Sequence, residues 1–136
     1  AEAAEIKGLA KLLSGKTIGV QASTSHEWFV KEYMKDSTIK SYDTMDNMIL
    51  DLVAGRIDVG YTSTTFLAPI HKKTPGLVAF GPPMTGGLLG RGVAVGTRKE
   101  STELREKFST AIGAMIADGS LSALATKWFG FDISAK

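Results

Sequence analysis

The chain has 136 residues, of which 16 are basic and 14 are acidic, and 43% of its residues are hydrophobic. This length suits one globular domain with its own core, and the nearly balanced charge excludes the basic surface of a nucleic-acid-binding protein. The sequence has no cysteine, and His26 and His71 lack the spacing of metal ligands, so we predict neither a metal nor a cofactor.

Short apolar runs alternate with amphipathic stretches along most of the chain. The first stretch predicts a helix over 1–13 that ends at Ser14-Gly15. Strands are predicted at 17–21, 39–42, 56–61, 77–80 and 92–97, and helices at 24–35, at 45–54 and after the cap at 62–65. This alternation is typical of βαβ units, so we predict an α/β fold with a mostly parallel five-stranded sheet flanked by helices.

The last forty residues predict a pair of helices. Asp118-Gly119 ends the first helix and Ser120 caps the second. The sheet offers little surface to cover both apolar stripes, so we expect an exposed patch through which copies of the chain form a homodimer or exchange segments. The expected patch comprises Leu104, Phe108, Leu121, Leu124 and Trp128.

The turn after the first predicted strand is the strongest candidate for a binding site. Thr24 and Glu27 have the Thr-x-x-Glu spacing of a capping box. Ser23, Thr24, Ser25 and His26 place side-chain donors beside the free N–H groups of a helix N-terminus, where the helix dipole also favours an anion such as a carboxylate. The alternative is that these hydroxyl groups only cap the helix.

Three polar loops should meet at one edge of the sheet. In a parallel sheet, ligands bind outside the carboxyl ends of the strands. The loops there are 21–26, 43–44 and 62–65, and all contain hydroxyl groups, which suit a zwitterionic or polyhydroxylated small molecule. None has the glycine pattern of a phosphate-binding loop, so we exclude nucleotides.

Four ordered blocks of the sequence resemble one family of binding proteins. The blocks are G-K-T-I-G-V-Q-A-S-T-S-H-E, Y-D-T-M-D-N-M-I-L-D-L-V-A-G-R-I-D, M-T-G-G-L-L-G-R-G-V-A-V-G-T-R-K and A-D-G-S-L-S-A-L-A-T-K-W-F-G-F-D. From about residue 12 to 133, the chain resembles the carboxy-terminal half of a family 3 periplasmic solute-binding protein of an ABC importer. Within the branch that binds lysine, arginine, ornithine, histidine or opines, it is most similar to octopine- and nopaline-binding proteins.

The resemblance implies two α/β lobes joined by hinge strands, with the ligand between them. It assigns 1–15 to an N-terminal helix that leads into the hinge and 16–95 to the second lobe. It assigns 96–136 to the returning hinge strand and to C-terminal helices that pack on a first lobe outside this sequence. It also implies a periplasmic location and an ABC permease as partner, although the sequence shows no secretory leader.

The same resemblance implies the ligand contacts. They are Gln21, Thr24, Ser25, His26 and Ser63. In amino-acid binders the position of Ser63 is typically an aspartate that pairs with the α-ammonium group. Serine there favours an opine, whose α-nitrogen is a secondary amine beside a second carboxylate, and His26 could donate to that carboxylate. We therefore expect a lobe that binds opines or related basic amino acids.

Two other classes of function were weighed against a binding protein that closes on its ligand without catalysis. A hydrolase would need proton transfer between a hydroxyl and a histidine, but Ser25 and His26 are neighbours at a helix start, which is poor geometry. An effector domain of a transcription regulator shares the two-lobed architecture, but the sequence contains no DNA-binding segment. We expect no enzymatic activity.

Overall fold

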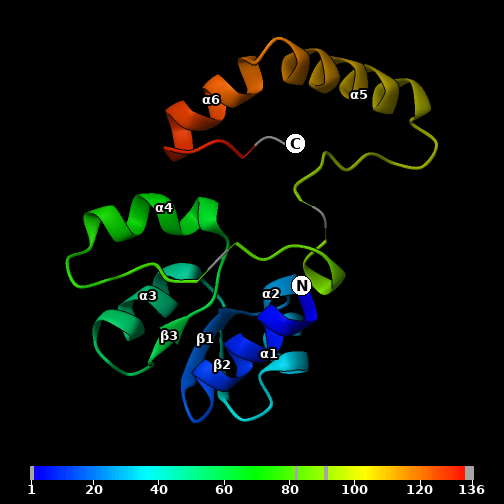
Figure 1. Ribbon diagram of the computed structural model, residues 1–136. Coiled ribbons are helices and arrows are strands. Elements are labelled where there is room, and N and C mark those ends of the chain that lie inside the picture. The colour runs from blue at the N-terminus through cyan, green and yellow to red at the C-terminus, as the bar shows by residue number, and fades with distance from the viewer. Residues whose placement is uncertain (1, 82, 91, 134–136) are drawn as a thin grey trace. The chain divides into compact units, whose positions relative to one another are not determined.

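The computed structural model describes residues 2–81, 83–90 and 92–133, and the chain divides into two compact units, 1–91 and 92–136 (Figure 1). In its described part, the first unit contains a parallel sheet of three strands. They are β1 (Thr17–Gln21), β2 (Thr38–Tyr42) and β3 (Val59–Gly60), in the order β2-β1-β3. Thr17 lies opposite Thr38, and Ile18 lies opposite Val59. The central strand is therefore the first one of the sequence.

Helices follow or precede each strand of the first unit. They are α1 (Glu2–Leu13), α2 (Ser25–Tyr33), α3 (Met45–Val53) and α4 (Thr64–Lys73), with a 3₁₀ turn η1 (Gly87–Leu89). The four predicted helices of this region are confirmed. The strand predicted over 56–61 is shorter than expected, because residues 56–58 form bends and the Arg56 N–H donates to the Asp51 carbonyl.

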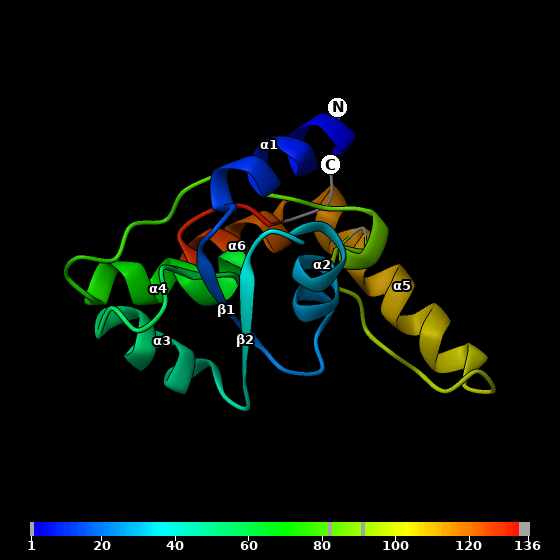
Figure 2. The same ribbon diagram turned by 90° about the horizontal axis from the view of Figure 1, so that it is seen from below.

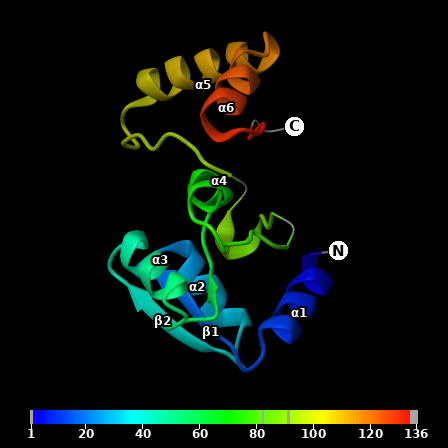
Figure 3. The ribbon, with the colours of Figure 1, turned by 90° about the vertical axis from the view of Figure 1, so that its left-hand side faces the viewer.

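The core lies on both faces of β1. Figure 2 shows β1 and β2 between α2 and α3, and Figure 3 shows α1 on the side away from α3. Ile18 and Val20 are fully buried on the face covered by α1 and α2, where Leu13, Phe29, Val30 and Met34 complete the cluster. Met48, Ile57 and Tyr42 form a smaller cluster under α3 on the other face. The alternation of side chains along one strand therefore divides the core into two layers.

Gly19 lets α3 approach the sheet. A Cβ atom at this position would lie 2.4 Å from Ile57 Cδ1 and 2.9 Å from Met48 Cγ, both closer than carbon atoms tolerate. Because these side chains are buried, neither has space into which to move. A side chain at position 19 would therefore separate the helix from the strand.

The carboxylate of Asp51, on α3, links this helix to β2. It accepts hydrogen bonds from Lys40 Nζ (2.7 Å), from the Tyr42 hydroxyl (2.7 Å) and from Arg56 Nε (2.6 Å). The hydrogen bond from Lys40, followed by those from Tyr42 and Arg56, holds the pKa of Asp51 well below its usual range. A charged carboxylate thus links the helix to the neighbouring strand throughout the physiological pH range.

The prediction of five strands is wrong for the described residues, which contain three. Residues 77–80 and 92–97 form no strand, and Val78 and Val93 are 80% and 97% exposed. An apolar run becomes a strand only where a neighbouring strand pairs with it. Residues 92–97 belong to a unit whose described part contains helices but no strand, so no such neighbour exists there.

The second unit contains the predicted helical pair, α5 (Thr102–Ala117) and α6 (Ser120–Phe129). Gly119, not Ser120, is the N-cap of α6, and the Asp118 carboxylate accepts from the Ser120 N–H at 2.8 Å. Of the expected patch, Leu104, Phe108, Leu124 and Trp128 are exposed, whereas Leu121 is half-buried.

Among the described residues, no single helix is both long and apolar enough to cross a membrane, and α5 with α6 meets these criteria only as a pair bent by 84°.

Substitutions at Gly19 and at Gly8 of α1 allow a direct test of the close approach at Gly19. We predict that Gly19→Ala lowers the free energy of unfolding by about 1–3 kcal/mol, because the new methyl group overlaps Ile57 and Met48. The control is Gly8→Ala, where no heavy atom lies within 4 Å of the added Cβ. That change should raise helix propensity and stabilise by about 0.5–1 kcal/mol. Chemical denaturation measures both, and equal effects would contradict the prediction.

Candidate functional site

The carboxyl ends of the three strands lead into three helix N-termini. Thr24, Thr44 and Ser63 are the N-caps of α2, α3 and α4, and each side-chain oxygen accepts from the N–H three residues later. The first two N–H groups of each helix have no partner within the helix. This edge of the sheet therefore presents several backbone donors and the positive ends of helix dipoles.

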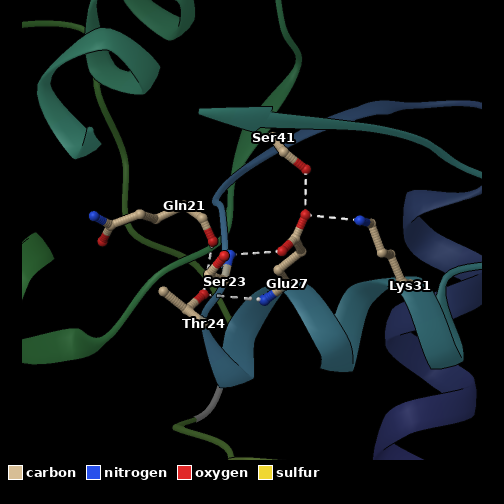
Figure 4. Close-up of polar contacts among 6 residues, drawn as sticks. All are labelled: Gln21, Ser23, Thr24, Glu27, Lys31 and Ser41. Carbon is tan, nitrogen blue, oxygen red and sulfur yellow. Dashed lines mark hydrogen bonds and ion pairs between the residues drawn. The ribbon is translucent and has the colours of Figure 1, made fainter. Parts of the chain in front are cut away.

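The turn between β1 and α2 has the predicted capping box, with one difference (Figure 4). Thr24 Oγ1 accepts from the Glu27 N–H at 3.2 Å and donates to the Gln21 carbonyl at 2.7 Å. Glu27 Oε2 accepts from the N–H of Ser23 at 2.7 Å, not from that of Thr24. Ser23 has a φ of +59°, a left-handed conformation that is uncommon for residues other than glycine. The carboxylate thus holds a turn that the backbone alone disfavours.

Glu27 also connects this turn to β2 (Figure 4). Its Oε1 atom accepts from Lys31 Nζ at 2.7 Å and from the Ser41 hydroxyl, and the residue is buried. These hydrogen bonds, with that from Lys31 the largest contribution, lower the pKa of Glu27 to about 2. The side chain is therefore ionised at neutral pH, and each of its two oxygens has a partner.

A cavity of about 230 Å³ lies at the same edge. Its lining residues come from the ends of β1 and β3 and from the starts of α2, α3 and α4. They are Gln21, Thr24, His26, Met45, Tyr61, Thr62, Ser63 and Phe66. Four of the five predicted site residues are thus brought together, whereas Ser25 is not among the lining residues.

His26 is half-buried at the cavity, where its ring meets the Tyr61 ring edge-on at 5.9 Å. Burial lowers the pKa of His26 below its ordinary value of 6.5. The imidazole is therefore mainly neutral at pH 7 and offers one donor and one acceptor.

Ser63 and Gln21 complete the polar part of the lining. Ser63 Oγ accepts from the Phe66 N–H at 3.3 Å and lies 3.1 Å from Thr65 Oγ1. Gln21 Nε2 donates to the Asp43 carbonyl at 3.4 Å, a long hydrogen bond that leaves the amide able to reorient. No acidic side chain lines the cavity among the described residues. The described lining of the cavity therefore has neutral hydrogen-bonding groups but no anionic partner for an ammonium group.

Four lining residues are not among the ligand contacts predicted from the sequence, namely Met45, Tyr61, Thr62 and Phe66. Of these, Thr62 belongs to the loop 62–65 that the sequence places at the binding edge. The sequence feature that marks these four residues is their position. Each lies within four residues of the carboxyl end of a strand or the start of a helix at the binding edge.

A wider surface depression lies along the outer side of α2. It is lined by Trp28, Lys31, Glu32, Tyr33, Lys35 and Leu88. Its lysines are already paired, Lys31 with Glu27 and Lys35 with Glu32. It contains none of the predicted site residues, so the smaller cavity is the candidate site. In the part of the chain that the structure describes, no three His, Cys, Asp or Glu side chains gather as ligands of a metal ion.

Comparison with known proteins places the chain among binding proteins. Residues 14–131 match the family described as bacterial extracellular solute-binding proteins, family 3. The histidine-binding periplasmic protein of Escherichia coli K12 is 38% identical, over 98% of this chain and 54% of that protein. The octopine-binding periplasmic protein of Rhizobium meliloti is 32% identical, over 90% of this chain and 48% of that protein.

A solved structure has the same fold. It is a periplasmic His/Glu/Gln/Arg/opine family-binding protein from Silicibacter pomeroyi in complex with lysine. Its TM-score is 0.73 at 30% sequence identity, over 91% of this chain and 55% of that one. The chain thus spans about half the length of the relatives that it matches.

The hydrogen bonds of Glu27 predict how stability depends on pH. Because its pKa is about 2 in the folded chain and 4.5 ordinarily, the charged carboxylate stabilises the fold above pH 4.5. This contribution is lost as pH falls from about 4.5 to about 2. We predict that Glu27→Gln lowers the free energy of unfolding by about 2 kcal/mol at pH 7 and flattens its dependence on acid pH.

The control for this prediction is Glu32→Gln on the same helix, since Glu32 is exposed and is paired with Lys35 at 3.6 Å. That variant should change stability by less than about 0.5 kcal/mol. Urea denaturation at several pH values measures both variants. An unchanged stability of Glu27→Gln at pH 7 would contradict the role given to the carboxylate.

Proposed function

Because the chain belongs to family 3 of the bacterial extracellular solute-binding proteins, we propose that it is a ligand-binding lobe for opines or related basic amino acids. The observation that carries the proposal is the cavity at the carboxyl ends of the strands. Gln21, Thr24, His26 and Ser63 line it beside the N-termini of α2 and α4. Neutral donors and helix dipoles suit a carboxylate without a full positive charge in the wall.

The lack of an acidic side chain favours an opine over a plain amino acid. A primary ammonium group buried without an anionic partner loses more hydration than it regains. Ser63 offers only a hydroxyl, and this oxygen already accepts from the Phe66 N–H. A plain amino acid has one carboxylate of its own beside the ammonium group, whereas the secondary amine of an opine has two. The second carboxylate reduces the need for an anionic partner from the protein. The proposed orientation therefore points the second carboxylate of the ligand toward α2 and α4.

The whole protein would work in uptake. We propose a periplasmic location, a second lobe that closes over the ligand, and an ABC permease in the membrane as the partner of the closed form. The names of the relatives support this proposal, since they are periplasmic binding proteins for histidine and octopine. In this arrangement 16–95 contributes one wall of the cleft, while 1–15 leads into the hinge and 96–136 returns from it to reach the other lobe.

We propose binding without catalysis. A hydrolase would require the hydroxyl nucleophile and its base to face one reacting atom. His26 lines the cavity, but Ser25 is not among the lining residues. Thr24, the lining hydroxyl residue closest to His26 in the sequence, donates to the Gln21 carbonyl and accepts from the Glu27 N–H. These hydroxyl groups are therefore used for helix capping and recognition.

Calorimetric titration with octopine, nopaline, arginine and lysine tests the proposed ligand class. We predict that the opines bind more tightly than the parent amino acids, and that His26→Ala weakens opine binding about tenfold through the lost hydrogen bond to the carboxylate. Trp28→Ala is the control, because this side chain lies on the same helix outside the cavity.

The same titration should depend on pH. Burial holds the pKa of free His26 below 6.5, and a bound carboxylate would raise it. Binding therefore takes up protons, so opine affinity should rise as pH falls from 7.5 to about 5.5, and His26→Ala should remove this rise. Equal affinity for arginine and octopine, or an unchanged affinity of His26→Ala, would contradict the proposal.

We also propose that copies of this chain pair, or exchange segments, through α5 and α6. Supporting this are the exposed side chains of Leu104, Phe108, Leu124 and Trp128. Light scattering at high micromolar concentration should give about twice the 14.5 kDa mass of one chain, and Trp128→Ser should shift the distribution toward the monomer. A strictly monomeric species at that concentration would refute pairing.

A further inference from the structure

The candidate cavity has an apolar wall that a carboxylate alone does not explain. Met45, Tyr61 and Phe66 form this wall, beside the hydroxyl, amide and imidazole groups of the same lining. All three side chains are half-buried, although they lie at the open edge of the sheet. A simple anion site would gain nothing from such a wall, because hydrocarbon surface next to a hydrated ion costs free energy.

Tyr61 is the most firmly held residue of the wall. Its N–H donates to the Gly19 carbonyl at 2.9 Å, which fixes its backbone to the central strand. Its ring stacks on Phe29 with the planes 3° apart and the centroids at 5.5 Å, and Phe29 is only 2% exposed. His26 meets the same ring edge-on. Tyr61 therefore reaches from the buried core to the cavity as a pre-oriented surface.

The other two members of the wall are also anchored. Met45 packs against the core cluster under α3, and its sulfur lies 4.0 Å from the Thr62 hydroxyl. Phe66 is held in the first turn of α4 by the hydrogen bond from its N–H to Ser63 Oγ. Because Met45 and Phe66 stand on helices and Tyr61 directly follows β3 and is bonded to β1, the wall can distinguish ligands by shape without rearranging.

We infer that Tyr61 is a specificity-determining residue whose ring, with Met45 and Phe66, contacts the alkyl group on the carbon that bears the second carboxylate of the ligand. This inference rests on the proposed function and narrows its ligand class. The class is N-(1-carboxyalkyl) amino acids, in which the carboxylate faces the helix N-termini and the alkyl group faces the wall. Octopine, an arginine whose α-nitrogen bears a 1-carboxyethyl group, is a member.

The ionisation of the phenol is consistent with this arrangement. Burial raises the pKa of Tyr61 to about 12, so the ring carries no charge that would repel a neighbouring carboxylate. The wall therefore remains neutral over the pH range in which His26 titrates.

Two probes isolate the alkyl contact. Octopine and N-(carboxymethyl)arginine have the same two carboxylates and the same secondary amine, and they differ by one methyl group. Calorimetry should show octopine bound about fourfold more tightly to the unsubstituted chain, the gain expected for burying one methyl group. Tyr61→Ala should reduce this ratio to about one, and Tyr61→Phe should keep it, because the ring and not the hydroxyl makes the contact.

Phe66→Ala provides a second variant, on α4, and a reduced ratio there would support the inference even if Tyr61→Ala failed to fold. A ratio that stays fourfold in folded Tyr61→Ala or Phe66→Ala would overturn the inference alone. Equal affinity of the unsubstituted chain for octopine and N-(carboxymethyl)arginine, with both bound, would also overturn the inference alone. Absence of binding of either probe to the unsubstituted chain would overturn both this inference and the proposed function.

Discussion

The buried carboxylate of Glu27 is the interaction on which the binding edge depends. It accepts the Ser23 N–H in a turn whose backbone is otherwise unfavourable, and it joins this turn to Lys31 on α2 and to Ser41 on β2. The preceding residue, Ala22, is also fixed, since its N–H donates to the Tyr42 carbonyl at 2.8 Å. The geometry of the turn is thus set before any ligand arrives, which reduces the entropy lost on binding.

The polar groups at this edge have different roles, which follow from this geometry. Cap hydroxyls such as those of Thr24 and Ser63 accept hydrogen bonds from the third N–H of their helices. The first two N–H groups of each helix are left for solvent or ligand. Glu27 itself is directed into the protein and away from the cavity, where its charge is balanced by Lys31. A site next to a buried carboxylate can therefore still favour an anion.

Local chemistry made much of this structure predictable from the sequence. The capping box at Thr24 and Glu27, the helix after Thr44 and the polar loops at the ends of three strands all depend on residues close together in the chain. These local signals, together with the family resemblance, identified Gln21, Thr24, His26 and Ser63, which the fold places around one cavity. They could not show that Ser25, one residue from His26, lies outside the lining, because that depends on how the helix is rotated against the sheet.

The features that were not predicted depend on distant partners. Residues 77–80 or 92–97 can form a strand only if a neighbouring strand pairs with them. Their apolar composition does not indicate whether that neighbour is present. The local sequence gives Tyr61 the pattern of an ordinary strand residue. Its proposed role in ligand specificity depends on ring contacts with Phe29 and His26, which are more than thirty residues earlier in the sequence. Both cases show tertiary contacts that give a residue a role beyond its local pattern.

Nuclear magnetic resonance of the backbone amides during titration with octopine tests most directly whether the helix N-termini bind the carboxylate of the ligand. If they do, the amide signals of Ser25, His26, Thr64 and Thr65 shift together and saturate, while those of the depression on the outer side of α2, such as Lys35 and Leu88, do not move. Shifts confined to that depression, or no saturable shift at any of the four amides, would contradict an anion site at this edge of the sheet.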